Sequence, residues 1–184
     1  MTMRRTSSRG VNGSDAQRLE LPEVDASLAL AVYRLEANSD AIYDTFQEIA
    51  ASDEESYQTA RLRAYAHFRS CAYKLLSHYI RHGFQEAFRW LLGMRGAAPK
   101  RCRIPLHQNP FHWGLLAMKA AGGPFMSPNR LRELATDFQA AYETGVAEGE
   151  LENFLRARKS QARRQALSTM LRELRRVHRP TLGE

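Results

Sequence analysis

The sequence predicts an all-α protein, a compact bundle of about six helices that follows a flexible N-terminal tail. Three observations lead to this prediction. Long stretches carry apolar residues every three or four positions, which is the spacing of one buried helix face. Residues that cap or end helices separate these stretches, and no run shows the apolar–polar alternation of a strand. With 184 residues, of which 43% are hydrophobic, the chain is long enough to bury one core without disulfides or metals.

The N-terminal segment differs in composition from the rest of the chain. Residues 1–22 are rich in serine, glycine and arginine and contain few apolar residues, which is typical of a flexible tail. We therefore expect a basic tail over 1–22 and a single helical domain over 23–184. No apolar stretch follows Arg4, Arg5 and Arg9, so the tail lacks the pattern of a secretory signal.

The first helical region has an interruption in its pattern. Leu28, Val32 and Leu35 share one helix face, and apolar residues at that spacing resume after Ser39. This pattern predicts either two short helices or one kinked helix over 25–49.

A long helix is expected next. Ser52 and Glu55 have the spacing of a capping box, in which each side chain bonds a free backbone N–H of the other residue. The helix is expected over 53–82, with Gly83 ending it in the left-handed conformation that glycine favours. A shorter apolar helix is expected over 84–94.

The second half of the domain begins with a proline-rich loop over 95–110, because its three prolines interrupt any regular element. A short helix over 111–121 follows. Ser127, with a proline directly after it, is a strong helix start, and that helix is expected to continue to about Gly145. The last helix is expected over 150–177.

Four positions represent the predicted core, one on the apolar stripe of each of four helices. They are Leu75, Phe88, Leu134 and Leu171. Each is expected to be buried.

The chain is basic, and its charge is segregated. It has 27 basic and 20 acidic residues, a net charge of +7, and nearly all of its bases are arginines. Acids dominate residues 23–56 and 133–152, whereas bases dominate 57–113 and 156–179. Either acidic and basic helices face each other and cancel, or the basic segments converge on one face that binds a phosphate backbone. A coding bias towards arginine would also raise the basic content.

Two basic segments are the candidate nucleic-acid-binding site. The loop supplies three bases beside aromatic residues, a combination that binds phosphate and stacks on bases. In the last helix, Arg156, Lys159 and Arg163 share a face, and the other bases are expected close to it or beside it. The candidate residues are Lys100, Arg101, Arg103, Arg156, Arg158, Lys159, Arg163, Arg164, Arg172 and Arg175.

Catalytic and metal-binding patterns are weak. His78 and His82 are spaced to bind one metal ion together, and His67 and Cys71 have the same spacing, but a zinc site needs further ligands and no recognised motif supplies them. We expect no catalytic residue, metal or cofactor. The two cysteines and the absence of a long apolar run predict a cytoplasmic protein with no membrane segment.

These observations favour a non-enzymatic nucleic-acid-binding accessory protein, or a small helical subunit of a nucleoprotein assembly, that contacts the backbone of DNA or RNA. The alternative is a helical protein-interaction adaptor, such as a secreted effector, whose basic face meets an acidic partner. The two differ in one structural property, because an adaptor also needs a contiguous exposed apolar patch.

The tail should be dispensable for folding, because it has almost no apolar surface to bury. A protein that starts at Leu21 is expected to melt within a few degrees of the full chain in a circular-dichroism scan. A large loss of thermal stability would contradict the boundary placed at residue 22.

Overall fold

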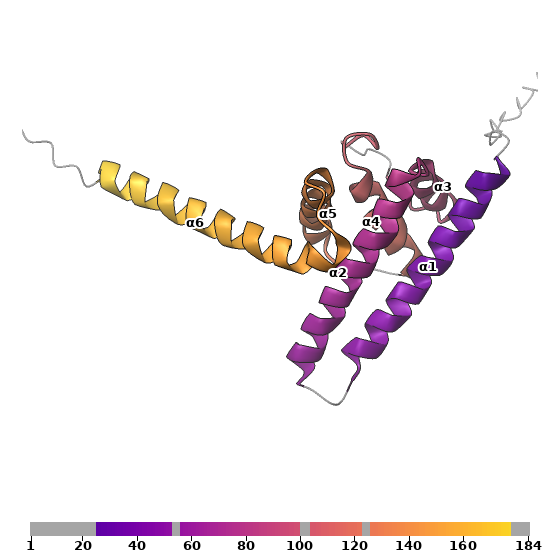
Figure 1. The fold of residues 1–184 in the computed structure, drawn as a ribbon, viewed down its shortest axis with the longest axis horizontal. Coiled ribbons are helices and arrows are strands. Elements are labelled where there is room, and N and C mark those ends of the chain that lie inside the picture. Colours follow the sequence, from indigo (N-terminus) through magenta and orange to yellow (C-terminus); the bar gives the residue numbers. More distant parts are fainter. Residues whose placement is uncertain (1–24, 53–55, 100–103, 123–125, 178–184) are drawn as a thin grey trace, which may run out of the picture.

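The computed structural model describes residues 25–52, 56–99, 104–122 and 126–177. In this part of the chain, α-helices and one 3-10 turn are the only regular elements, which confirms the predicted all-α bundle (Figure 1). The elements are α1 (Ala26–Ala50), α2 (Tyr57–Arg81), α3 (Glu86–Met94), α4 (Pro110–Gly122), α5 (Pro128–Glu143), η1 (Glu148–Glu150) and α6 (Leu151–Val177). The predicted tail over 1–22 lies outside the described residues.

The first region forms one helix rather than two. Helix α1 continues through Ser39, although a polar residue there interrupts the apolar pattern. Ser39 is fully buried, and its hydroxyl donates a 2.6 Å hydrogen bond to the carbonyl oxygen of Leu35 one turn earlier. Because the helix backbone itself accepts this bond, the buried hydroxyl does not require the helix to break.

Helix α2 begins later than predicted. Its N-cap is Ser56, whose hydroxyl accepts a 3.4 Å hydrogen bond from the backbone N–H of Thr59. The capping box predicted at Ser52 is therefore wrong as the start of this helix, and its partner Glu55 lies outside the described residues. The predicted end is confirmed, because Gly83 follows the helix with φ +77°, in the left-handed region.

Two later helices start with a proline directly after a polar cap. The side-chain oxygen of Asn109 accepts a hydrogen bond from the N–H of His112 at the start of α4, and Ser127 does the same for Arg130 in α5. The start predicted at Ser127 is therefore confirmed. The loop before α4 is held to this helix by Trp113, whose indole N–H donates to the carbonyl oxygen of Ile104 at 2.9 Å.

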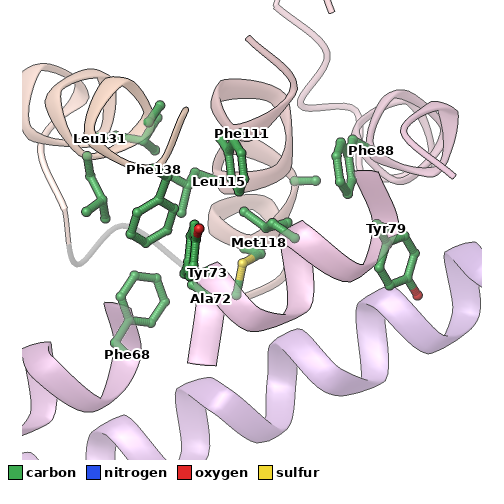
Figure 2. Packing of buried hydrophobic residues seen from close by; sticks show 14 of the residues in the cluster. Phe68, Ala72, Tyr73, Tyr79, Phe88, Phe111, Leu115, Met118, Leu131 and Phe138 are labelled. Atoms are coloured by element: carbon green, nitrogen blue, oxygen red, sulfur yellow. The ribbon is translucent and has the colours of Figure 1, made fainter. Parts of the chain in front are cut away.

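The core is rich in aromatic side chains and surrounds the middle of α2 (Figure 2). The ring of Tyr73 stacks on Phe111 of α4, with ring centroids 5.9 Å apart, and meets Phe138 of α5 edge-on at 5.3 Å. Its hydroxyl donates a 3.0 Å hydrogen bond to the carbonyl oxygen of Val146, in the segment that leads to α6. Tyr73 of α2 thus contacts α4, α5 and the segment that leads to α6.

Helix α4 approaches α2 closely at Gly114. A Cβ atom at this position would lie 2.5 Å from a methyl carbon of Leu76, which is closer than two non-bonded carbon atoms can approach. The absence of a side chain at Gly114 therefore sets how closely these two helices pack.

Among the described side chains of α6, those that belong to the core lie in its first five residues. Leu151 and Leu155 are buried, and Glu152 accepts two hydrogen bonds, both 2.7 Å, from the guanidinium of Arg69 in α2. Arg158 donates to Asp137 of α5 at 3.0 Å. These contacts fix the direction in which the rest of α6 leaves the bundle.

The core predictions are confirmed at two positions and only partly at a third. Phe88 and Leu134 are buried, and Leu75 packs against the core while remaining half-buried. Leu171 is 55% exposed, so its assignment to the core is wrong. The reason is that α6 has left the bundle well before this residue (Figure 1).

Alanine substitutions should separate these positions. We expect Phe88→Ala to lower the free energy of unfolding by about 3–5 kcal/mol and Leu134→Ala by about 2–5 kcal/mol, because each leaves a cavity. Leu171→Ala is the matched surface control and should cost under about 1 kcal/mol. Urea unfolding measures all three, and a large loss for Leu171→Ala would contradict its exposure.

The ion pair at the base of α6 should be strongly coupled. A double-mutant cycle with Arg69→Met and Glu152→Gln is expected to give a coupling energy of about 1–3 kcal/mol, because the pair is bidentate and mostly shielded from water. The exposed pair of Lys74 and Glu148, 3.5 Å apart, is the control and should give under about 1 kcal/mol. Equal coupling energies would mean that the Arg69 pair does not anchor the helix.

Candidate functional site

Beyond Leu155, α6 projects from the bundle as a single helix (Figure 1). We call residues 156–173 the α6 arm. Every side chain in the arm is exposed except that of Arg158, which is half-buried. A helix face that stays exposed over this length is available to a binding partner.

Five of the predicted site residues are exposed bases on the arm. None of them forms an ion pair with an acid in the described part of the chain, although the Arg164 side chain bonds the carbonyl oxygen of Ser160. They are Arg156, Lys159, Arg163, Arg164 and Arg172. No acid of the described residues therefore neutralises their positive charge.

One face of the arm changes from basic to apolar along its length. Arg156, Lys159 and Arg163 lie on this face, and Arg164 lies beside it. Leu167, Met170 and Leu171 continue it towards the C-terminus and are 60%, 57% and 55% exposed. At about 100° per residue, all except Arg164 fall within about 120° of arc. The arm thus presents a basic half and then an apolar half on one side.

The other predicted site residues are placed differently. Arg158 points back to the bundle, where it binds Asp137 and lies over the ring of Phe154. Arg172 lies about 160° around the helix from Arg156, on the opposite side of the arm. Arg175 is in the last turn of α6, where the structure describes the backbone but not the side chains.

The basic loop cannot be compared with the arm. Lys100, Arg101 and Arg103 lie outside the described residues.

Four bases of the bundle form ion pairs with acids in the described part of the chain. Arg69 binds Glu152, Lys74 binds Glu148, and Arg95 of the loop after α3 binds Glu36 of α1. Arg89 and Glu86 pair within α3. For these residues the segregated charges cancel, as one of the two interpretations predicts. The exposed bases of the arm, by contrast, have no such acid partner among the residues that the structure describes.

The outward face of α1 has a composition complementary to that of the α6 arm. Leu30 and Tyr33 are 48% and 68% exposed, and Asp40, Asp44 and Glu48 follow along the same face. These five residues fall within about 80° of arc. We call this surface the α1 face. It begins apolar and ends acidic.

Negative charge accumulates in the acidic half of the α1 face. Partial burial raises the pKa of Asp40, and the neighbouring carboxylates of Glu36 and Asp44 add to this effect, while Arg95 opposes it. Asp44 and Glu48 are exposed and have no basic partner among the residues that the structure describes. A cation brought to this surface would relieve the repulsion between its carboxylates.

The histidine and cysteine pairs do not form a metal centre in the described residues. The sulfur of Cys71 lies 3.4 Å from Nε2 of His67, and the rings of His78 and His82 are 4.4 Å apart. No group of three or more candidate ligands occurs in the described ranges. Burial raises the pKa of the Cys71 thiol, which disfavours the thiolate that would bind a metal or attack a substrate.

Among the described helices, none has a stretch that is both long and apolar enough to cross a bilayer.

Sequence reasoning missed the apolar half of the arm, because it assigned Leu171 to the core and did not consider Leu167. A signal was present in their phase. Leu167 lies about 160° around the helix from Leu151, which packs into the bundle, so one straight helix cannot bury both against the same surface. The α1 face was missed because its acids were counted as a block and not placed around the helix.

Comparison with known proteins assigns no role to these surfaces. No family model matches the chain, and neither does any curated protein or any solved structure. The α6 arm and the α1 face are therefore the features from which a function can be proposed.

Proposed function

We propose that the protein is a non-catalytic interaction protein whose α6 arm docks on a protein surface that is acidic in one part and apolar in the next. The observation that carries this proposal is the continuous face on which Arg156, Lys159 and Arg163 are followed by Leu167, Met170 and Leu171. Exposed apolar side chains in a contiguous patch are typical of a protein interface. Bases in line with them select an acidic partner and fix its register.

A lipid surface fits this face less well. A helix that lies in a membrane interface buries an apolar face along its length, with bases on the opposite or flanking sides. In the arm, the apolar side chains occupy only the C-terminal half of the face, and the other half is basic. A protein surface can match two halves of different chemistry, whereas a bilayer surface is uniform along the helix.

Nucleic-acid binding is the second candidate function. The observation that favours it is the set of five exposed bases on the arm that have no acidic partner among the described residues, since a projecting basic helix can follow a phosphate backbone. Such contacts would be independent of nucleotide sequence. In this case the apolar half of the arm would not take part.

Two triple variants of the full chain test both candidates. The first, Arg156→Ala with Lys159→Ala and Arg163→Ala, removes the basic half. The second, Leu167→Ala with Met170→Ala and Leu171→Ala, removes the apolar half. All six substitutions are at exposed positions and introduce the best helix former, so the helix should be retained.

The probes are a labelled synthetic helical peptide with one apolar half and one acidic half, a scrambled peptide of the same composition, a short DNA duplex and a short single-stranded RNA. Protein docking predicts that either triple variant weakens binding of the ordered peptide by about tenfold or more, which corresponds to about 1.4 kcal/mol. The scrambled peptide should bind more weakly, because only the ordered peptide matches both halves.

Nucleic-acid binding predicts a different pattern of affinities. The duplex or the RNA would bind the wild type and the apolar-half variant equally, and the basic-half variant more weakly. With about four phosphate contacts, affinity would also fall by roughly a hundredfold between 50 and 200 mM salt. This pattern, together with no preference for the ordered peptide, would overturn the docking proposal in favour of the second candidate.

A further inference from the structure

The protein itself contains a surface that matches the α6 arm. The arm runs from basic to apolar, and the α1 face runs from apolar to acidic. When two helices lie antiparallel, the end of one meets the beginning of the other. An antiparallel pair therefore brings the apolar halves together and the basic half against the acidic half.

The lengths of the two surfaces agree as well. Fifteen residues separate Tyr33 from Glu48 in α1, and fifteen separate Arg156 from Leu171 in α6. Each distance corresponds to about 22 Å of helix. With Leu171 opposite Tyr33, Arg156 lies opposite Glu48.

The residues between these ends fall into matching positions. In the same register, Lys159 lies beside Asp44, and Arg163 and Arg164 lie beside Asp40. The small residue Ala37 lies opposite Leu167 and leaves room for its side chain. Each exposed base of this face thus meets a carboxylate, and the exposed leucines meet apolar side chains.

We propose that the protein self-associates by docking the α6 arm of one copy, antiparallel, on the α1 face of a second copy. This inference rests on the proposed function and names its partner. The contact is between two different surfaces, so it closes into a dimer if both copies exchange arms and continues as a chain if they do not.

Docking within one copy does not explain the match. Helix α6 packs on η1, α2 and α5, and the arm leaves the bundle on the side away from α1 (Figure 1). The arm of the same copy is thus directed away from its own α1 face, and a second copy can bring the two surfaces together.

Pairing of two arms with each other is less favourable. A parallel pair would place Arg156, Lys159 and Arg163 of both copies side by side, and their like charges would repel. An antiparallel pair centred on Leu167 to Leu171 would bury the apolar halves but leave these bases without acids. The α1 face satisfies both halves of the arm.

A charge-swap experiment tests the contact. The arm variant carries Arg156→Glu and Lys159→Glu, and the face variant carries Asp44→Lys and Glu48→Lys. All four positions are exposed and without a described ion-pair partner, so the fold should be retained, which circular dichroism would verify. Arg172→Glu, on the opposite side of the arm, is the matched control.

Sedimentation of the full chain gives the readout. We expect the average mass of the wild type to rise with concentration over about 1 µM to 1 mM, the range of weak to moderate association. Added salt should weaken this association, because its charged pairs lie near the surface. Each double variant alone should associate at least about tenfold more weakly, because its arm and face then carry charge of the same sign. An equimolar mixture of the two should regain association, since each arm then meets a face of opposite charge.

The possible results separate this inference from the proposed function. A wild type that stays monomeric throughout would overturn self-association, while binding of the synthetic peptide would still support docking on another protein. Self-association that survives both double variants, or that the mixture does not restore, would overturn the contact between arm and face. Loss of association in Arg172→Glu equal to that of the arm variant would also overturn it.

Discussion

The packing around Tyr73 is the interaction on which the rest of the structure depends. Its ring fills the space between Phe111 of α4 and Phe138 of α5, and its hydroxyl bonds the backbone just before α6. An aromatic residue with a polar end suits this position, because the ring is buried while the hydroxyl still requires a partner. The bundle and the departure of its last helix are thus organised by the same side chain of α2.

The distribution of charge follows from this packing. Helix α1 packs against α3, and α6 begins against α2, so acids and bases from distant parts of the sequence come together as Arg95 with Glu36 and Arg69 with Glu152. These pairs neutralise some of the bases of the bundle. Of the arm's bases, Arg158 binds Asp137 of the bundle. The exposed bases of the arm have no ion-pair partner among the described residues, so positive charge extends along the projecting helix.

Much of the fold could be predicted from the sequence, because helix periodicity and caps are local signals. The helix start at Ser127 and the stop at Gly83 depend on a few neighbouring residues, and both were predicted. Ser52 and Ser56 were harder to separate, because either serine is a suitable cap and the choice between them depends on where the helix packs.

The candidate site was less accessible to sequence reasoning. Periodicity shows that Leu171 belongs to an apolar stripe, but not whether that stripe faces the same bundle or a different molecule. The answer depends on where α6 leaves the core, which is a property of the tertiary packing. The bases Arg156, Lys159 and Arg163 could be predicted, because charged residues in a stretch with few apolar neighbours are expected to be exposed. Their continuation into an apolar surface could not be predicted without knowing the direction of the arm.

The arm also has a consequence for how the molecule resists proteolysis. Beyond Arg158 the described side chains of the arm are exposed, so local opening of the helix there does not require the bundle to unfold. Its many arginine and lysine residues are cleavage sites for a trypsin-like protease, which needs only a short unfolded stretch. Limited digestion would therefore remove the arm before it reaches the bundle, and any molecule bound along the arm would slow that first cut.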